Sequence, residues 1–229
     1  MAALNSISQL KKIDCRKYCE FDGDIPRSSS LPEKLLADVS STISDGGLIV
    51  YPTDTIYCIG ADIFDQQSVK RVYMAKRRPF DMPISVSVLD EKMANRIAHL
   101  NKAARLLMKE LMPGPLIILA EKREDVPELL TAGTGTVGIR MPDHPVAREI
   151  IRAAGPLTSA SANLHSSSSP VLVEQCMKEL GGEISLYLDC GRNALGAQST
   201  IVDTTDDTFP IVREGPVPEE RILEVLASI

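Results

Sequence analysis

The sequence predicts an α/β fold of the mixed α+β kind, in which helices cover a β-sheet. Two observations predict it. Short apolar runs of strand length alternate along the chain with longer segments whose apolar residues recur at helical spacing. Turns rich in glycine and proline separate these segments, and the chain shows no internal repeat. The alternation argues against all-β, coiled-coil and repeat architectures.

The first helix is predicted directly after Ser30, which we expect to cap the helix while Glu33 reaches back to the cap. Apolar residues then recur on one face until Gly46-Gly47 ends the helix. Start signals or helical spacing predict further helices around 69–73, after Asp90, and over 101–111, 144–154, 173–180 and 219–226.

Strands are predicted wherever short apolar or alternating runs occur. Residues 84–88 alternate between apolar and small polar side chains, as in a half-buried strand, whereas 116–120 is apolar throughout. Other strands are predicted at 48–51, 59–63, 136–141, 157–159, 184–189, 201–202 and 211–212.

The 229 residues can bury a core, and nothing in residues 31–229 reads as an interdomain linker, so this part is predicted to be one domain. Residues 1–30 lack periodicity and are predicted to be an N-terminal extension of turns and extended chain. No stretch reaches the roughly 18 apolar residues of a membrane span, and the first residues lack the apolar core that is expected of a secretory signal. We therefore expect a cytoplasmic protein, with a copy in an organelle left open by the basic residues at 11–17.

The five cysteines are scattered and form no Cys-x-x-Cys pair, which favours reduced thiols. Cys15 and Cys19 are spaced like half of a metal site, but no second pair with histidine follows, so free thiols are the better interpretation.

Polar side chains follow the predicted strand at 48–51, where Pro52-Thr53-Asp54-Thr55 turns the chain. Open α/β sheets place their ligands at such strand ends. A basic cluster follows at 70–78, in a helix that we expect Pro79 to stop. This cluster is either a solvated helix face or an anion-binding group.

Further polar groups occur near the later strands. Residues 133–138 carry the letters G-x-G-x-x-G, but a strand pattern follows instead of the helix that a dinucleotide site requires, so a loop that approaches a nucleotide is more plausible. Arg140 ends its strand, and 158–163 and 196–200 are rich in hydroxyl and amide groups. These residue types suit phosphate and carboxylate oxygens, whereas the separated histidines argue against a catalytic triad.

Taken in order, seven motifs resemble those of the YrdC-like family, whose members are threonylcarbamoyl-adenylate synthases. They are Tyr51-Pro52-Thr53-Asp54-Thr55-Ile56-Tyr57, Lys76-x-Arg78-Pro79, Pro113-Gly114-Pro115-Leu116, Val137-Gly138-Ile139-Arg140-Met141-Pro142, Ser161-Ala162-Asn163, Ser199-Thr200-Ile201-Val202-Asp203 and Arg213-Glu214-Gly215. The resemblance implies the single-domain form of the synthase, with 31–229 as a catalytic domain of open twisted sheet, flanking helices and a large concave cleft.

It also implies a reaction in which L-threonine, bicarbonate and ATP give threonylcarbamoyl-AMP and pyrophosphate for tRNA modification. The implied partners are these three substrates, a possible contact with tRNA, and downstream tRNA threonylcarbamoyl transferase proteins, but no membrane. ATP is a substrate accompanied by Mg²⁺, and no residue is assigned to a metal. The implied site residues are Lys76 and Arg78 for catalysis, Thr55, Arg140, Ser161 and Ser199 for L-threonine, and Arg78, Thr136, Asn163 and Arg213 for the nucleotide.

The chain departs from the family pattern at Cys58, Met82 and Ser87, where many members have glycine, asparagine and histidine. The alternative hypothesis is a non-catalytic RNA-binding factor in tRNA or ribosome maturation, which the net charge of −6 and the lack of tryptophan weaken. A third is a related carbamoyl-transfer domain, which usually lies inside a much larger chain.

Overall fold

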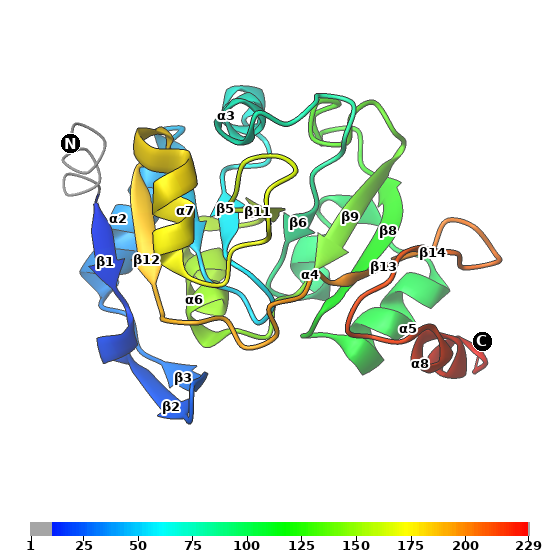
Figure 1. The fold of residues 1–229 in the computed structure, drawn as a ribbon. Coiled ribbons are helices and arrows are strands. Elements are labelled where there is room, and N and C mark those ends of the chain that lie inside the picture. The colour runs from blue at the N-terminus through cyan, green and yellow to red at the C-terminus, as the bar shows by residue number, and fades with distance from the viewer. Residues whose placement is uncertain (1–10, 229) are drawn as a thin grey trace.

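The computed structural model describes residues 11–228 (Figure 1). Its α-helices are α2 (Glu33–Ser44), α3 (Gln66–Lys76), α4 (Glu91–Ala94), α5 (Lys102–Leu111), α6 (Pro145–Ala154), α7 (Val173–Leu180) and α8 (Glu219–Leu226). Two short 3-10 helices, η1 and η2, lie at Arg16–Tyr18 and Gly181–Glu183. Among the helices of the described chain, none has the length and apolar character that crossing a membrane demands.

One sheet has five strands, in the order β1 (Lys12–Asp14), β12 (Leu186–Asp189), β4 (Ile49–Tyr51), β5 (Cys58–Gly60) and β11 (Ala160–Ser161). The first three strands run parallel, and the last two pair antiparallel. Because β1 is the edge strand, part of the segment that we predicted as an extension lies in a main sheet. A hairpin of β2 (Cys19–Asp22) and β3 (Ile25–Ser29) follows it. Residues 1–10 of that segment lie outside the described residues.

The second sheet has seven strands. Its path is β10 (Leu157–Thr158), β6 (Val86–Ser87), β9 (Thr136–Arg140), β8 (Leu116–Lys122), β13 (Thr200–Asp203) and β14 (Ile211–Arg213), with β7 (Ala98–His99) paired to β8. Parallel and antiparallel pairs are mixed in it. The mixed α/β class is therefore confirmed, with the strands divided between two main sheets and the β2–β3 hairpin.

A single extended segment joins the two sheets. β10 pairs with β6 of the seven-stranded sheet, and β11, two residues later, pairs with β5 of the five-stranded sheet. The hydroxyl of Tyr51 on β4 contacts the Oγ of Ser87 at 3.0 Å and the carbonyl of Thr158 at 3.1 Å. Residues 157–161 therefore hold the sheets next to each other, and this junction positions the candidate site.

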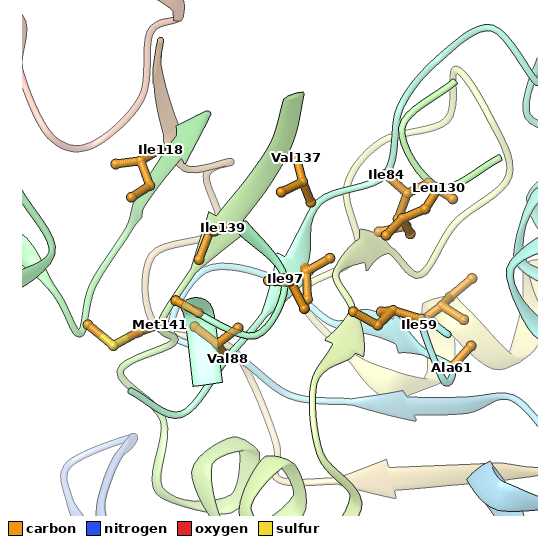
Figure 2. Close-up of a cluster of buried hydrophobic side chains, with 14 of the residues drawn as sticks. Ile59, Ala61, Ile84, Val88, Ile97, Ile118, Leu130, Val137, Ile139 and Met141 are labelled. Atoms are coloured by element: carbon orange, nitrogen blue, oxygen red, sulfur yellow. The ribbon is translucent and has the colours of Figure 1, made fainter. Parts of the chain in front are cut away.

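Side-chain alternation on β8 and β9 separates a core face from an open face. Ile118, Val137 and Ile139 are buried and point into the larger core, where they lie with Val88, Ile97 and Met141 (Figure 2). A second apolar core lies between the five-stranded sheet and helices α2 and α6, which pack on each other. The opposite faces of β8 and β9 are left for the candidate site.

Most helix ends follow the predicted signals. Asp90 accepts a hydrogen bond from the amide of Met93 and so caps α4, as expected. The expected cap at Ser30 is wrong, because Pro32 is the N-cap residue of α2 and no side chain caps it. The carboxylate of Glu149 on α6 instead accepts a hydrogen bond from the amide of Leu31 at 3.0 Å. A helix distant in the sequence thus supplies the hydrogen-bond acceptor for the amide just before α2.

Candidate active site

A cavity of about 370 Å³ opens where the two sheets meet. Its volume lies within the usual range for small-molecule sites. Its walls come from the loop after β4, the segment before β6, strands β8 and β9, the β10–β11 segment, and the strands β13 and β14. Segments that are far apart in the sequence therefore contribute to one concave surface.

Strand periodicity explains which side chains of β8 and β9 reach the cavity. Ile117 and Leu119 line it from β8, and Thr136, Gly138 and Arg140 line it from β9, each at every second residue. A Cβ at Gly138 would lie 2.7 Å from the Oγ of Ser85, so the glycine leaves room at the floor. A dinucleotide fingerprint at 133–138, which the sequence argued against, is excluded, because the strand β9 and not a helix follows the glycines.

Arg140 is the most constrained of these side chains. Its Nη1 donates to the Oγ1 of Thr55 at 2.7 Å, and its Nη2 forms an ion pair with Asp54. Only 3% of Arg140 is exposed, and Thr55 is fully buried. Asp54 also accepts the amide hydrogen of Asp143 at 3.0 Å. The guanidinium is thus fixed against the Thr53–Thr55 turn, which brings the strand-end groups into the cavity.

Two buried polar atoms in the cavity wall lack a partner. The Nε of Arg140 and the Oγ of Ser199 make no hydrogen bond within the described chain, although both side chains are at least 97% buried. Leaving such a group unsatisfied costs about 1–3 kcal/mol, and more for a charged group. A donor and a hydroxyl left free in one cavity wall favour a bound ligand with acceptor oxygens.

Three arginines share this cavity. Arg78 lines it after α3 and donates to the carbonyls of Met82 and Pro83 at 3.1 and 3.0 Å. Arg213 on β14 donates to the carbonyl of Ser199 at 2.9 and 2.8 Å. Burial, and then the charges of Arg140 and Arg78, lower the pKa of Arg213. Since no aspartate or glutamate is found among the described residues of the wall, the cavity has an excess of positive charge that suits an anion.

Lys76 and Asn163 lie beneath the cavity wall, outside the set of residues that line it. Lys76 is 2% exposed, and its Nζ donates to the Oγ of Ser161, to the carbonyl of Asn163 and to the Oδ1 of Asn163 at 3.3, 2.8 and 3.2 Å. It also donates to the carbonyl of Ser161. Burial, with the nearby charge of Arg78 second, lowers the pKa of Lys76 to about 8. Its geometry is that of a group that fixes the segment 161–163.

The structure thus brings the predicted site residues together at one place. Seven of them line the cavity, namely Thr55, Arg78, Thr136, Arg140, Ser161, Ser199 and Arg213. The other two, Lys76 and Asn163, support Ser161 from below. Among the participants that were missed are Asp54, the partner of Arg140, and Ser85 in the wall. The alternation at 84–88 placed Ser85 on a polar face, but only the fold shows what that face lines.

The helix that carries the first part of the basic cluster ends earlier than expected. α3 ends at Lys76, three residues before Pro79. The next residue, Arg77, adopts a left-handed conformation with φ 50°. The amide of Arg78 bonds back to the carbonyl of Tyr73 at 2.9 Å. This turn directs Arg78 toward the cavity, whereas Lys76 remains on the buried side of the helix.

The three departures from the family pattern have different positions. Cys58 lines the cavity, and its Sγ lies 3.8 Å from the Oγ of Ser159. Ser87 is buried, and its Oγ accepts a hydrogen bond from the hydroxyl of Tyr51. Met82 is exposed, and its carbonyl accepts a hydrogen bond from Arg78. Only Cys58 therefore changes the wall of the cavity directly.

The residues of the cavity do not fit a protein-held Mg²⁺. Magnesium in proteins prefers carboxylate oxygens together with substrate phosphates. Among the described lining residues there is no carboxylate, and no cluster of three or more histidine, cysteine, aspartate or glutamate residues suited to a metal occurs within 11–228. We derive no chemical step through a metal ion.

Comparison with known families places the chain among related proteins. The model of the Sua5/YciO/YrdC family, which is described as telomere recombination, matches residues 41–215. The chain belongs to this family. It is also 41% identical over 185 residues to a putative threonylcarbamoyl-AMP synthase of Mycobacterium tuberculosis, with 80% of this chain and 85% of the relative covered. All seven lining residues among the predicted site residues fall within the matched range 41–215.

Solved structures of family members have the same fold. Sua5 of Pyrococcus abyssi, in a crystal structure with L-threonine, matches with a TM-score of 0.85 and 29% identity over 96% of this chain. The chain spans 61% of the length of that protein. YciO of E. coli matches with a TM-score of 0.79 and 26% identity, over 93% of this chain and 98% of YciO. The concave site described above is therefore built on the fold of this family.

Proposed function

We propose that this protein is an L-threonylcarbamoyladenylate synthase, which condenses L-threonine, bicarbonate and ATP to threonylcarbamoyl-AMP and pyrophosphate. The observation that carries the proposal is the cavity itself. Two buried polar atoms, the Nε of Arg140 and the Oγ of Ser199, are left without partners in the described chain and face a site with three guanidinium groups. The names of the relatives support the same activity.

We assign the carboxylate of L-threonine to the buried side of the cavity, at Arg140. Arg140 is fixed in orientation by Asp54 and Thr55, so its remaining donor is preorganised for a carboxylate oxygen. Ser199 lines the same cavity, and its hydroxyl has no partner within the described chain. The structure of Pyrococcus abyssi Sua5 with L-threonine supports threonine as the ligand.

The phosphates of ATP are assigned to the outer arginines. The threonine amine adds to bicarbonate to form a carbamate with loss of water, and a carbamate oxygen then attacks the α-phosphorus of ATP. The bond from that phosphorus to the bridging oxygen breaks, and pyrophosphate leaves. Arg78 and Arg213 lie where they can bind the phosphate oxygens and stabilise the charge that gathers in this step. Mg²⁺ would arrive with the phosphates of ATP.

Lys76 and Asn163 have an indirect part in this proposal. They hold the backbone of residues 161–163 and thereby position the hydroxyl of Ser161, which lines the cavity. We keep Arg78 as the catalytic cation and treat Lys76 as a positioning residue. The product is a reactive mixed anhydride, so a tRNA threonylcarbamoyl transferase is the expected consumer, and the five free thiols fit a reducing, cytoplasm-like compartment.

The test is pyrophosphate release by the purified chain, with L-threonine, bicarbonate and ATP each omitted in turn. Release should require all three substrates. Arg140→Lys keeps the charge but loses the planar fork, so the KM for L-threonine should rise by about tenfold or more while the KM for ATP changes little. Arg221→Lys, an exposed ion-pair residue on α8, is the matched control and should behave like the parent.

Pyrophosphate release that ignores L-threonine would overturn the proposal. The alternative hypothesis of a non-catalytic RNA-binding factor makes the opposite prediction: binding of tRNA, without release of pyrophosphate under any combination of substrates. The near-complete burial of Arg140 speaks against RNA, because its guanidinium is turned inward and away from a flat partner surface.

A further inference from the structure

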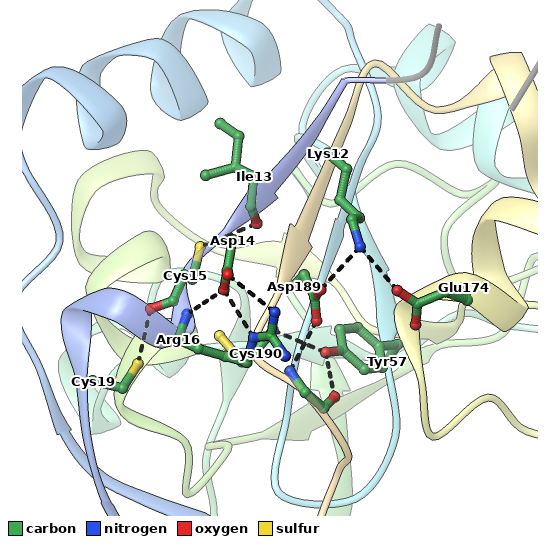
Figure 3. A network of polar contacts seen from close by, with 11 residues as sticks. Lys12, Ile13, Asp14, Cys15, Arg16, Cys19, Tyr57, Glu174, Asp189 and Cys190 are labelled. Carbon is green, nitrogen blue, oxygen red and sulfur yellow. Dashed lines mark hydrogen bonds and ion pairs between the residues drawn. The ribbon is translucent and has the colours of Figure 1, made fainter. Parts of the chain in front are cut away.

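Three of the five cysteines meet at the edge of the five-stranded sheet (Figure 3). Cys15 follows β1, Cys19 begins β2, and Cys190 follows β12. β1 and β12 pair in parallel up to Asp14 and Asp189, and the amide of Cys15 continues the ladder with a 2.7 Å hydrogen bond to the carbonyl of Asp189. Residues at matching positions on neighbouring strands point to the same side of a sheet.

This register brings two thiols together in the smaller core. Cys15 and Cys190 are 0% and 4% exposed, and both belong to the apolar cluster beneath α2 and α6. Residues paired on neighbouring strands lie about 5 Å apart, so the continued ladder places Cys15 beside Cys190. The turn through η1 then returns the chain, so that Cys19 packs on the same cluster from outside.

The three thiols lie at one edge of the sheet and differ in accessibility (Figure 3). Hydrogen-bonded contacts with the thiols of Cys15 and Cys19 raise the pKa of Cys190, and the contact from Cys190 lowers the pKa of Cys19. Cys19 is partly exposed, and its Sγ donates a hydrogen bond to the carbonyl of Cys15 at 3.3 Å. Cys19 is therefore the thiol that solvent reaches, and Cys190 is the buried thiol at its side.

A metal does not explain the cluster, because no group of three or more histidine, cysteine, aspartate or glutamate residues within 11–228 has an arrangement that could hold one. The chemistry that remains for adjacent thiols is oxidation. Cys58 and Cys176 are also buried, but they lie on β5 and α7, away from this sheet edge.

We propose that Cys19 and Cys190 form a thiol oxidation site, at which a peroxide converts the pair into a reversible disulfide. The thiolate of Cys19 attacks the peroxide, one O–O bond breaks, and Cys19 becomes a sulfenic acid while hydroxide leaves. The thiol of Cys190 then attacks the sulfenic sulfur, the S–S bond forms, and water leaves. Two thiols are oxidised by two electrons, and the peroxide is reduced.

The disulfide would tie the β2–β3 hairpin to the segment that leads from β12 to the cavity. The amide of Cys190 donates to the hydroxyl of Tyr57 at 3.0 Å, and that hydroxyl donates to the carbonyl of Gly191 at 2.7 Å. Farther on, the side-chain amide of Asn193 donates to the carbonyl of Thr53. The site is separate from the cavity, since Cys15, Cys19 and Cys190 are not among the residues that line it.

The experiment is peptide mapping of the full chain after treatment with hydrogen peroxide. Trypsin cuts after Lys12, Arg16, Lys17, Arg27, Lys178 and Arg192, so the three cysteines fall in separate peptides, 13–16, 18–27 and 179–192. Folded protein that is oxidised, alkylated and digested without reductant should give the 18–27 and 179–192 peptides joined, about 2 Da below the sum of their masses. Treatment with dithiothreitol before digestion should abolish the joined species.

The variants separate the proposal from general oxidation. Cys176→Ser is the matched control for loss of a buried thiol and should keep the crosslink. Cys190→Ser should lose it, and Cys19 should then go on to sulfinic and sulfonic acid. A crosslink that joins 13–16 to 179–192 would overturn the assignment to Cys19. Oxidation of Cys19 in the folded parent without any crosslink, or a crosslink that forms only in urea, would overturn the site as a whole.

Discussion

Lys76 shows how a single residue can be identified correctly and yet act from a different position. Its ammonium group is buried and donates to the segment 161–163, so it is separated from the cavity by Ser161. Arg78, two residues later, lies in the wall because Arg77 takes a left-handed conformation between them. At this scale, the direction of a side chain decides between contact with a ligand and support of the residue that makes it.

The depressed pKa of Lys76 predicts a pH dependence of stability. The pKa is about 8 in the folded protein, against its ordinary 10.5. Between these values the unfolded chain holds a proton that the folded protein has lost, so the free energy of unfolding rises with pH over this range. The free energy of unfolding of the parent minus that of Lys76→Met should therefore rise, by at most about 3 kcal/mol, from pH 8 to pH 10.5.

The measurement is urea unfolding of both proteins across this range, in which the titrations of all other groups cancel in the difference. A difference that stays constant with pH would show that burial does not depress the pKa of Lys76. A difference that falls with pH would show that hydrogen bonds to the ammonium outweigh its burial.

At the scale of elements, the glycine of the Arg213-Glu214-Gly215 motif is required for packing, in addition to the role of the arginine in the cavity wall. The chain after β14 passes directly over the start of β13, and a Cβ on Gly215 would meet the amide nitrogen of Thr200 and come within 2.6 Å of the carbonyl carbon of Ser199. The glycine lets the two backbones approach closely. The same contact helps to place Ser199 in the cavity wall.

Gly215→Ala should therefore lower both stability and activity. The clash involves backbone atoms that cannot rotate away, so we expect a loss of about 1–3 kcal/mol in the free energy of unfolding. Displacement of Ser199 should also raise the KM for L-threonine. Gly182→Ala in η2 is the matched control, because its Cβ would have no atom within 4 Å. Equal stability of the two variants, measured by urea unfolding, would contradict this packing argument.

At the scale of the whole molecule, the cavity depends on how two sheets are joined. The five-stranded sheet carries the Thr55 loop, the seven-stranded sheet carries Arg140, and residues 157–161 pair with both. A ligand in the cavity contacts groups from both sheets, so its binding energy opposes their separation. Binding to the folded state alone must stabilise the whole molecule.

L-threonine with a non-hydrolysable ATP analogue should therefore raise the thermal midpoint. At one hundred times the dissociation constant, one ligand contributes about 2.7 kcal/mol, which corresponds to roughly 5–10 °C for a domain of this size. D-threonine is the matched control and should give a smaller shift. Differential scanning calorimetry checks this, and an equal shift with Arg140→Lys would remove that residue from the threonine site.

Local patterns predicted most elements because they depend on neighbouring residues alone. The alternation at 84–88 and the helical spacing at 101–111 are satisfied within a few residues, so β6 and α5 occur where expected. The prediction of a helix cap at Ser30 was wrong because the hydrogen bond that replaces it comes from a distant residue. Glu149, which is 118 positions from Leu31, satisfies the chain at that point. A competing partner so far along the chain leaves no local signal.

The sequence by itself determined the mixed α/β class, the strand ends and the set of cationic and hydroxyl residues, because these follow from periodicity, turn chemistry and ordered motifs. Only the tertiary structure decided that the strands form two main sheets and a hairpin, that Lys76 and Asn163 lie beneath the cavity wall, and that Cys190 lies beside Cys15 and Cys19. These features depend on contacts between distant segments. Such contacts exist only once the chain has buried its two cores and fixed the register of β1 on β12.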